Sequence, residues 1–238
     1  KYQVTKLKRF HEKIEILKVK GNALFRIPNK MKESLAPLEK VHAVDPNDLQ
    51  TTQMLAKAYS DTGNPLKAAE LTKQIVAATG NDRVSQVNLA ITYFDAKQFE
   101  EAAVVISQLR ASNQLVEERD YLTAMNVYTA LKKQENELIA VMEAGFNSGA
   151  LKPTWQRYNK LGDAYYDSNL ENSMPKAIEY WSKAAPMAKD GAIYLNLAIV
   201  QCQEEMWAAC KENAKNAIAK GGIDVNHAKA QIAKADKR

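Results

Sequence analysis

The two cysteines, Cys202 and Cys210, are the side chains of this 238-residue chain best suited to a covalent reaction. One falls late in the first helix of a predicted helix pair, and the other falls early in the second helix. They could form a disulfide that closes the pair in an oxidising compartment, or they could be two small buried side chains, since free cysteine packs like a small hydrophobic residue. Cys210 stands where other helix pairs have a packing alanine, which favours the second interpretation. Bond formation needs Cα atoms within about 7 Å, so the sequence leaves both open.

No other set of side chains has the spacing of a catalytic or metal site. The cysteines are not in a Cys-x-x-Cys arrangement. His11, His42 and His227 are far apart in sequence, and each is expected to be a surface or interface residue. No phosphate-binding glycine motif and no Gly-x-Ser-x-Gly motif is present. Neighbouring carboxylates in sequence diverge around a helix, whereas a catalytic dyad needs them to converge. These pairs are Glu100–Glu101, Glu117–Glu118 and Glu204–Glu205. We therefore predict a protein without catalytic residues, metal or cofactor, and not an enzyme.

The elements that carry these residues are organised by an internal repeat. Residues 53–109 match themselves when shifted by 34 positions. The matched pairs are Leu55 with Leu89, Ala56 with Ala90, Tyr59 with Tyr93, Ala68 with Ala102 and Ala69 with Ala103. A fixed period between about 20 and 50 residues is typical of repeat architectures. Leu, Ala and Tyr at positions i, i+1 and i+4 lie along one side of a helix, and the later alanine pair opens a second helix.

The chain is predicted to be all-α, because no sustained alternation of β-branched residues indicates a strand. We expect a single solenoid domain over residues 1–238. Its predicted hairpins span approximately 15–46, 48–80, 82–112, 115–147, 153–188 and 191–221, and a capping helix spans approximately 224–237. Each repeat of such an array packs on its neighbours, and the last helix presents a polar outer side.

These residues resemble the tetratricopeptide repeat family, which also has a 34-residue period. The likeness is strongest over residues 48–112 and 153–220, where Tyr158, Leu161, Gly162 and Tyr165 match the family pattern of the first helix. The resemblance implies a right-handed α-solenoid that holds a peptide or a partner protein in its concave groove. Residues 143–152, 176–185 and 217–223 further resemble tetratricopeptide proteins of TonB-type energy transduction clusters in Gram-negative bacteria, which are periplasmic.

The groove positions follow from the repeat frame. They are Gln50, Gln53, Lys57 and Ser60, then Val84, Val87, Ile91 and Phe94, then Gln156, Asn159, Asp163 and Tyr166, and finally Ala192, Leu195, Ile199 and Cys202. Val87, Ile91 and Phe94 form either an exposed apolar strip that marks an interaction site or a strip that packs on a neighbouring repeat. Lys57 is the only cation at these positions, so a clamp for a C-terminal carboxylate is not expected.

Charge is distributed unevenly along the chain. The formal charge is +5, but residues 1–40 contain eleven Lys or Arg against four Glu, whereas residues 41–210 contain fifteen against twenty-one Asp or Glu. Basic ends on an acidic body argue against a nucleic-acid partner, which requires cations clustered along one face. The basic N-terminal helix is either a solvated face or a contact for an anionic partner or membrane surface. No apolar stretch approaches the length of a membrane span.

The sequence thus predicts a non-catalytic scaffold or adaptor that binds a protein or peptide in its groove. One alternative is a structural module that forms a homo-oligomer, and another is the regulatory part of a larger protein. The expected compartment is the periplasm, with the cytoplasm as the alternative. The chain begins at Lys1 without a leader, so we expect a mature form or a fragment.

Overall fold

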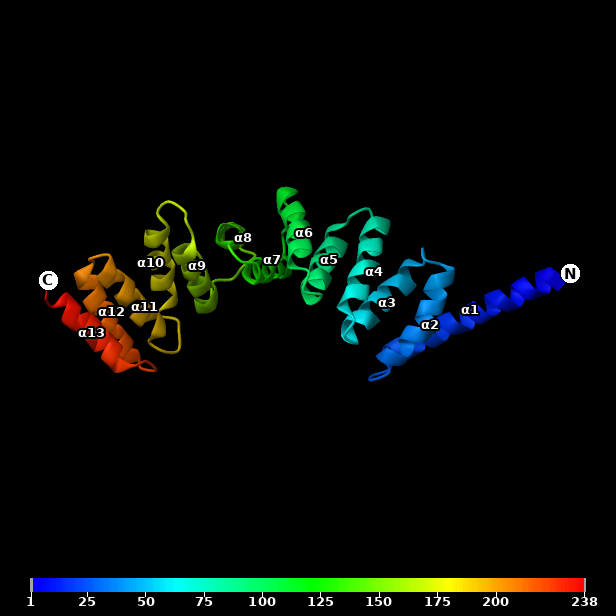
Figure 1. The fold of residues 1–238 in the computed structure, drawn as a ribbon, viewed down its shortest axis with the longest axis horizontal. Coiled ribbons are helices and arrows are strands. Elements are labelled where there is room, and N and C mark those ends of the chain that lie inside the picture. The colour runs from blue at the N-terminus through cyan, green and yellow to red at the C-terminus, as the bar shows by residue number, and fades with distance from the viewer. Residues whose placement is uncertain (1, 238) are drawn as a thin grey trace. The chain divides into compact units, whose positions relative to one another are not determined.

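A computed structural model describes residues 2–237, and all its regular elements are α-helices (Figure 1). The helices within the described range are α1 (Tyr2–Arg26), α2 (Met31–Val44), α3 (Leu49–Asp61), α4 (Pro65–Ala78), α5 (Arg83–Asp95), α6 (Phe99–Ala111), α7 (Glu118–Ala130), α8 (Glu135–Asn147), α9 (Trp155–Asp167), α10 (Ser173–Ala184), α11 (Ala192–Gln203), α12 (Trp207–Lys220) and α13 (Val225–Ala235). No strand occurs in residues 2–237. The expected all-α class is therefore confirmed.

Two compact units make up the fold. The first comprises Lys1–Leu115 and Leu122–Leu131, and the second comprises Val116–Tyr121 and Lys132–Arg238. Helix α7 contributes its first residues to the second unit and its remaining residues to the first. That residues 1–238 form one continuous domain stays a prediction, and each unit is described by itself below.

The 34-residue period reappears in the helix boundaries of the first unit. It separates Leu49 from Arg83, where α3 and α5 begin, and Pro65 from Phe99, where α4 and α6 begin. An aspartate caps both first helices. The Asp48 carboxylate accepts from the Thr51 backbone N–H at 3.3 Å, and the Asp82 carboxylate accepts from that of Ser85 at 3.1 Å. Such caps satisfy N–H groups that have no partner inside the helix.

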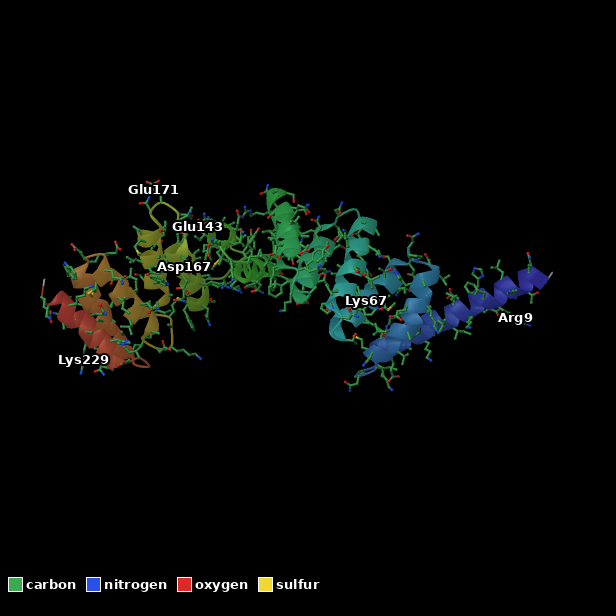
Figure 2. All side chains as sticks on the ribbon, viewed as in Figure 1. Arg9, Lys67, Glu143, Asp167, Glu171 and Lys229 are labelled. Atoms are coloured by element: carbon green, nitrogen blue, oxygen red, sulfur yellow. A yellow bond between two sulfur atoms is a disulfide. The ribbon has the colours of Figure 1, made fainter. Side chains whose placement is uncertain are left out.

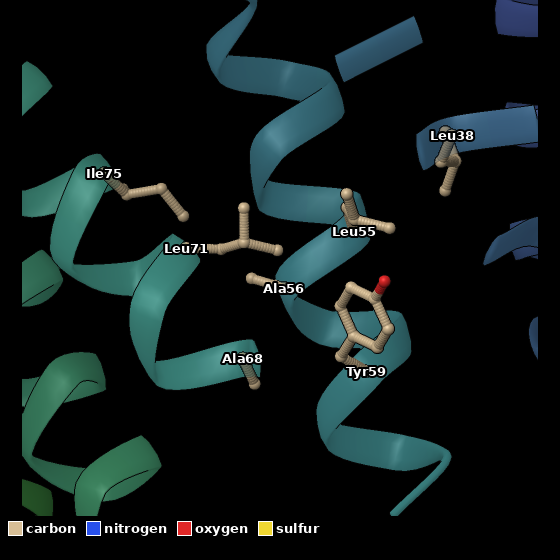
Figure 3. Packing of buried hydrophobic residues seen from close by; sticks show 7 residues of the cluster. All are labelled: Leu38, Leu55, Ala56, Tyr59, Ala68, Leu71 and Ile75. Carbon is tan, nitrogen blue, oxygen red and sulfur yellow. The ribbon is translucent and has the colours of Figure 1, made fainter. Parts of the chain in front are cut away.

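The first unit buries its apolar side chains between the helices of neighbouring pairs. Figure 3 shows one such cluster. Its members are Leu38 from α2, Leu55, Ala56 and Tyr59 from α3, and Ala68, Leu71 and Ile75 from α4. The small side chains of Ala56 and Ala68 are both buried, which allows α3 and α4 to approach closely. A helix pair cannot cover these residues alone, so stacking of successive pairs stabilises the array.

Helix α1 is one continuous helix that packs on α2 at its C-terminal half. A Cβ atom at Gly21 would lie 2.7 Å from Cδ2 of Leu38, so glycine permits this contact. Nearer the N-terminus, Leu7 and Ile16 are 59% and 67% exposed. This exposed part of α1 also carries Arg9, which is labelled in Figure 2. The basic N-terminal helix therefore presents apolar and cationic side chains to solvent.

The second unit depends on a close contact between α9 and α10. A Cβ atom at Gly162 would lie 2.5 Å from Cδ1 of Trp181. The indole of Trp181 is buried, and it occupies the space that any larger residue at position 162 would need. Glycine at position 162 therefore leaves the space that the indole fills.

A half-buried carboxylate joins three helices of the second unit. Glu143 on α8 accepts hydrogen bonds through Oε1 from the hydroxyls of Tyr165 on α9, at 2.6 Å, and Tyr180 on α10, at 3.2 Å. The two tyrosine rings stack at 5.7 Å. Burial, followed by the charge of Glu143, raises the pKa of Tyr180 to about 12. Both tyrosines therefore stay neutral donors at ordinary pH.

A disulfide joins α11 to α12. Cys202 and Cys210 are bonded, with their Cα atoms 5.2 Å apart, and both are buried. The preference for two unbonded packing cysteines was therefore wrong. The hairpin formed by α11 and α12 brings the two cysteines close enough to bond. The two sulfurs lie 3.6 and 3.8 Å from the carbonyl oxygen of Gln231, so the bond also borders the final helix, α13.

Candidate functional site

The groove positions predicted on α3 are polar and largely accessible. Gln50, Gln53 and Lys57 are exposed and Ser60 is half-buried. The Lys57 ammonium forms an ion pair with Asp61 at 2.7 Å, within the same helix. Its charge is thus already partnered by a carboxylate of the same helix.

The apolar positions predicted on α5 differ from one another in exposure. Val84 is 49% exposed, but Val87 is only 1% exposed. Ile91 and Phe94 are half-buried, and the Phe94 ring packs at 5.4 Å from that of Phe99 on α6. The prediction of Val87 as a partner-binding residue is therefore corrected: its side chain packs inside the first unit. The strip as a whole is not a continuous free surface.

The four positions predicted on α9 recur at intervals of three and four residues, which places them along one side of that helix. Gln156, Asp163 and Tyr166 are exposed, and Asn159 is half-buried. Thr154 caps this helix and accepts through Oγ1 from the Arg157 backbone N–H at 3.3 Å. Helix α9 thus begins at Trp155 and presents this row of side chains.

Asp163 is held by two neutral donors. Its Oδ1 accepts from Nε1 of Trp181 at 2.8 Å, and its Oδ2 accepts from Nδ2 of Asn159 at 2.8 Å. The Tyr166 ring lies 5.4 Å from the Trp181 ring. A carboxylate and two aromatic rings are therefore fixed relative to one another, with the carboxylate and Tyr166 accessible at the surface.

These side chains line a pocket of about 300 Å³, which we call the α9–α11 pocket. Its lining residues are Asp163, Tyr166 and Asp167 from α9, Trp181 from α10, and Asn196, Ile199 and Val200 from α11. Asp167 is labelled in Figure 2. The pocket thus combines carboxylates, an amide, aromatic rings and aliphatic side chains, a mixture typical of binding sites.

The pocket is electrostatically negative. Partial desolvation by the neighbouring side chains raises the pKa of Asp163, and the nearby charge of Asp167 raises it further, against the lowering effects of the Trp181 hydrogen bond and Lys160. Among the described residues, no ion pair within 4 Å involves Asp163 or Asp167. The two carboxylates therefore face the pocket without a directly bonded cation.

The structure brings together only part of the predicted set. Asp163, Tyr166 and Ile199 line one pocket, whereas Gln156 lies outside it. Cys202 was expected in the groove, but it is buried in the disulfide. Sequence reasoning did not place Asp167, Trp181 or Asn196 in the site. Asp167 follows Asp163 by four residues, and residues at this spacing are neighbours on the surface of a helix. This spacing could have identified Asp167 as part of the site.

A larger hollow of about 560 Å³ lies in the first unit at the ends of α4, α5 and α6. Its lining residues are Val76, Asn81, Gln86, Leu89, Val105, Gln108, Ser112 and Gln114. None carries a charge and none was predicted in the groove, so this hollow offers less basis for selecting a ligand. Within residues 2–237, no group of three or more His, Cys, Asp or Glu side chains is placed to hold a metal ion. No helix in that range is long and apolar enough to cross a membrane.

Comparisons with known proteins give structural likeness only. No protein-family model matches the chain, and no curated protein matches it. A crystal structure of MamA protein has a TM-score of 0.59 and 22% identity over 74% of this chain and 92% of that one. MamA 41-end from Desulfovibrio magneticus RS-1 has a TM-score of 0.56 and 15% identity over 74% and 94% of the two chains. The pilF protein of Pseudomonas aeruginosa has a TM-score of 0.50 and 15% identity over 93% and 97%.

At identities this low, these similarities concern the fold. They agree with the helix pairs, with the 34-residue spacing of their boundaries and with the small or glycine residues where paired helices approach. This is the spacing of tetratricopeptide repeats. The chain therefore has the tetratricopeptide-type α-solenoid fold.

Proposed function

We propose that this protein is a non-catalytic scaffold that binds a peptide segment of a partner protein along α9 and α11. The observation that carries the proposal is the α9–α11 pocket, whose lining residues Asp163, Tyr166 and Asn196 are exposed. The Asn196 amide offers both a donor and an acceptor, which can pair with the backbone of an extended peptide. The fold supports the proposal in general, because first helices of repeat arrays form extended binding surfaces.

Selection of peptides from a random displayed library on the wild-type chain tests this function. Isothermal titration calorimetry then compares each selected peptide with the wild type, Tyr166→Ala and Asn196→Ala. We expect the two variants to weaken binding by tenfold or more, because they remove an exposed ring and a backbone-pairing amide. The matched control is Asn226→Ala on α13, an exposed asparagine outside the pocket. Selected peptides that bind all four proteins equally would overturn the proposal.

We further propose that the protein works in an oxidising compartment, the periplasm. The bonded pair Cys202–Cys210 supports this proposal, since disulfides persist in oxidising compartments and are rare in the cytosol. Acid quenching of cells followed by maleimide labelling tests it: the chain should remain unlabelled until reductant is added. Labelling before reduction would contradict it. A role beside a TonB-type envelope system rests on the sequence resemblance alone and stays a prediction.

A second candidate function is self-association through α1. The exposed side chains of Leu7, Phe10 and Ile16 on a helix rich in lysine favour it. Size-exclusion chromatography with light scattering tests this function. A wild-type protein with the mass of an oligomer, together with a Phe10→Ala variant with the mass of a monomer, would support self-association. A wild-type protein that is already monomeric excludes it.

A further inference from the structure

The negative charge and the exposed aromatic ring of the α9–α11 pocket restrict what it can hold. Asp163 and Asp167 are one helical turn apart, and both line the pocket. Like charges at this spacing destabilise a helix. Partial desolvation, together with the charge of Asp167, holds the pKa of Asp163 above its usual range. A cation between the two carboxylates would relieve both effects. An anionic ligand would worsen them.

We propose that the α9–α11 pocket binds a cationic side chain, Lys or Arg, of the partner peptide. This inference rests on the proposed function and names the chemistry of the group that the partner inserts. The ligand's ammonium or guanidinium group lies between the carboxylates of Asp163 and Asp167. Its aliphatic stem lies along the apolar side of the pocket formed by Ile199 and Val200.

The hydrogen bonds of Asp163 leave room for this ligand. Each carboxylate oxygen of Asp163 already accepts one bond, from Trp181 or from Asn159. A carboxylate has about four lone-pair sites, so each oxygen retains capacity for a donor from outside. The two existing donors orient the carboxylate without neutralising it, because both are uncharged.

The aromatic part of the pocket adds a second attraction for a cation. The Tyr166 ring is 44% exposed and leans on the buried Trp181 ring at 5.4 Å. A cation within about 6 Å of an aromatic centroid is attracted by the ring face. Guanidinium also stacks on aromatic rings and pairs with carboxylates through two parallel bonds. The pocket should therefore prefer arginine to lysine and both to an uncharged side chain of similar length.

The indole N–H of Trp181 provides a local signal, because it donates to the carboxylate that would meet the ligand. The probes are acetyl-Gly-X-Gly-amide peptides in which X is arginine, lysine, norleucine or glutamate. Titration into ¹⁵N-labelled wild-type protein should shift the Trp181 indole resonance saturably with the arginine and lysine peptides. Norleucine matches the length of the lysine stem without its charge and should give an affinity at least fivefold lower. Equal affinities for lysine and norleucine would overturn the inference.

Two variants separate the charge from the fold. Asp167→Asn leaves both hydrogen bonds of Asp163 in place, and Asp163→Asn keeps an oxygen that can accept from Trp181. Each should weaken binding of the arginine peptide by fivefold or more. The control variant Asp224→Asn, at the exposed N-cap position just before α13, should not weaken it. Unchanged affinity in Asp167→Asn would contradict the inference.

The two proposals fail separately. Library-selected peptides that need Tyr166 and Asn196 but lack a basic residue would defeat only the cation site. Cation-selective titration without any selected peptide that depends on Tyr166 would support the cation site and defeat the scaffold function.

Discussion

Breaking the Cys202–Cys210 bond should destabilise the second unit alone. The cysteines are eight residues apart in sequence, and closing a loop of this length in the unfolded chain lowers its entropy by roughly 8 cal/mol/K. At 25 °C this corresponds to about 2.5 kcal/mol of stability for the bonded form. With a urea dependence of about 1.5 kcal/mol per M, reduction should lower the urea midpoint by about 1.7 M.

The placement of tryptophan makes this effect local to measure. The chain has three tryptophans, Trp155, Trp181 and Trp207, and all three positions fall in the second unit. Trp207 is the first residue of α12 and packs against the core cluster that contains the disulfide. Tryptophan emission therefore reports unfolding of the second unit, whereas far-ultraviolet circular dichroism reports helices of both. We expect reductant to shift the fluorescence transition to lower urea concentration. The part of the ellipticity change that comes from the first unit should not shift.

Two controls decide the interpretation. Thiol titration in urea confirms that the bond has been reduced in the sample being unfolded. The double variant Cys202→Ala/Cys210→Ala should be insensitive to reductant and at least as unstable as the reduced wild type, because it also loses buried sulfur contacts. A fluorescence midpoint that moves by less than about 0.3 M after confirmed reduction would refute the loop-closure reasoning.

Substitutions at three positions test other parts of the account. Gly162→Ala places a methyl group 2.5 Å from the Trp181 ring, and it should cost about 1–3 kcal/mol and alter tryptophan emission; an unchanged melting temperature would contradict this. Asp82→Ala should lose a helix cap worth about 1 kcal/mol. Hydrogen bonds from Ser85 lower the pKa of Asp82 to about 2 from its ordinary 3.8, so its contribution is present above pH 4 and is lost as the pH falls toward 2. Asp82→Asn should keep the cap without that acid dependence, as acid titration by circular dichroism can show. Glu143→Leu should cost about 1–3 kcal/mol for each tyrosine hydroxyl left unpaired, whereas Glu143→Gln keeps an acceptor; equal losses in urea unfolding would count against the hydrogen bonds.

The fold was predictable because local signals repeat. Tyr158, Leu161, Gly162 and Tyr165 match the pattern of a first helix, and all four positions lie on α9. An aspartate at the N-cap position or a proline in the first turn marks the start of a helix. Both signals act through local backbone geometry, so neighbouring residues alone determine them. A period of 34 then implies stacking, since each helix pair exposes an apolar side that only another pair can cover.

The site was predictable only in part, because it depends on contacts between distant segments. The frame placed Asp163 and Tyr166 on one helix face, but Trp181 and Asn196 reach the same pocket from other helices. Val87 was assigned to the groove, but α5 turns this side chain into the core. The disulfide depends on a Cα separation of 5.2 Å between two helices, which separation in sequence does not determine. That the remaining α3, α5 and α9 positions bind a partner stays a prediction.

Hydrogen–deuterium exchange with a library-selected peptide tests the central claim most directly. Exchange is measured by mass spectrometry on the wild-type chain with and without the peptide at saturation. The account predicts slower exchange in segments of α9 and α11 on binding, and no such change in the Tyr166→Ala variant at the same peptide concentration. Protection confined to α1, or to α12 and α13, would contradict the claim that the α9–α11 pocket holds the partner.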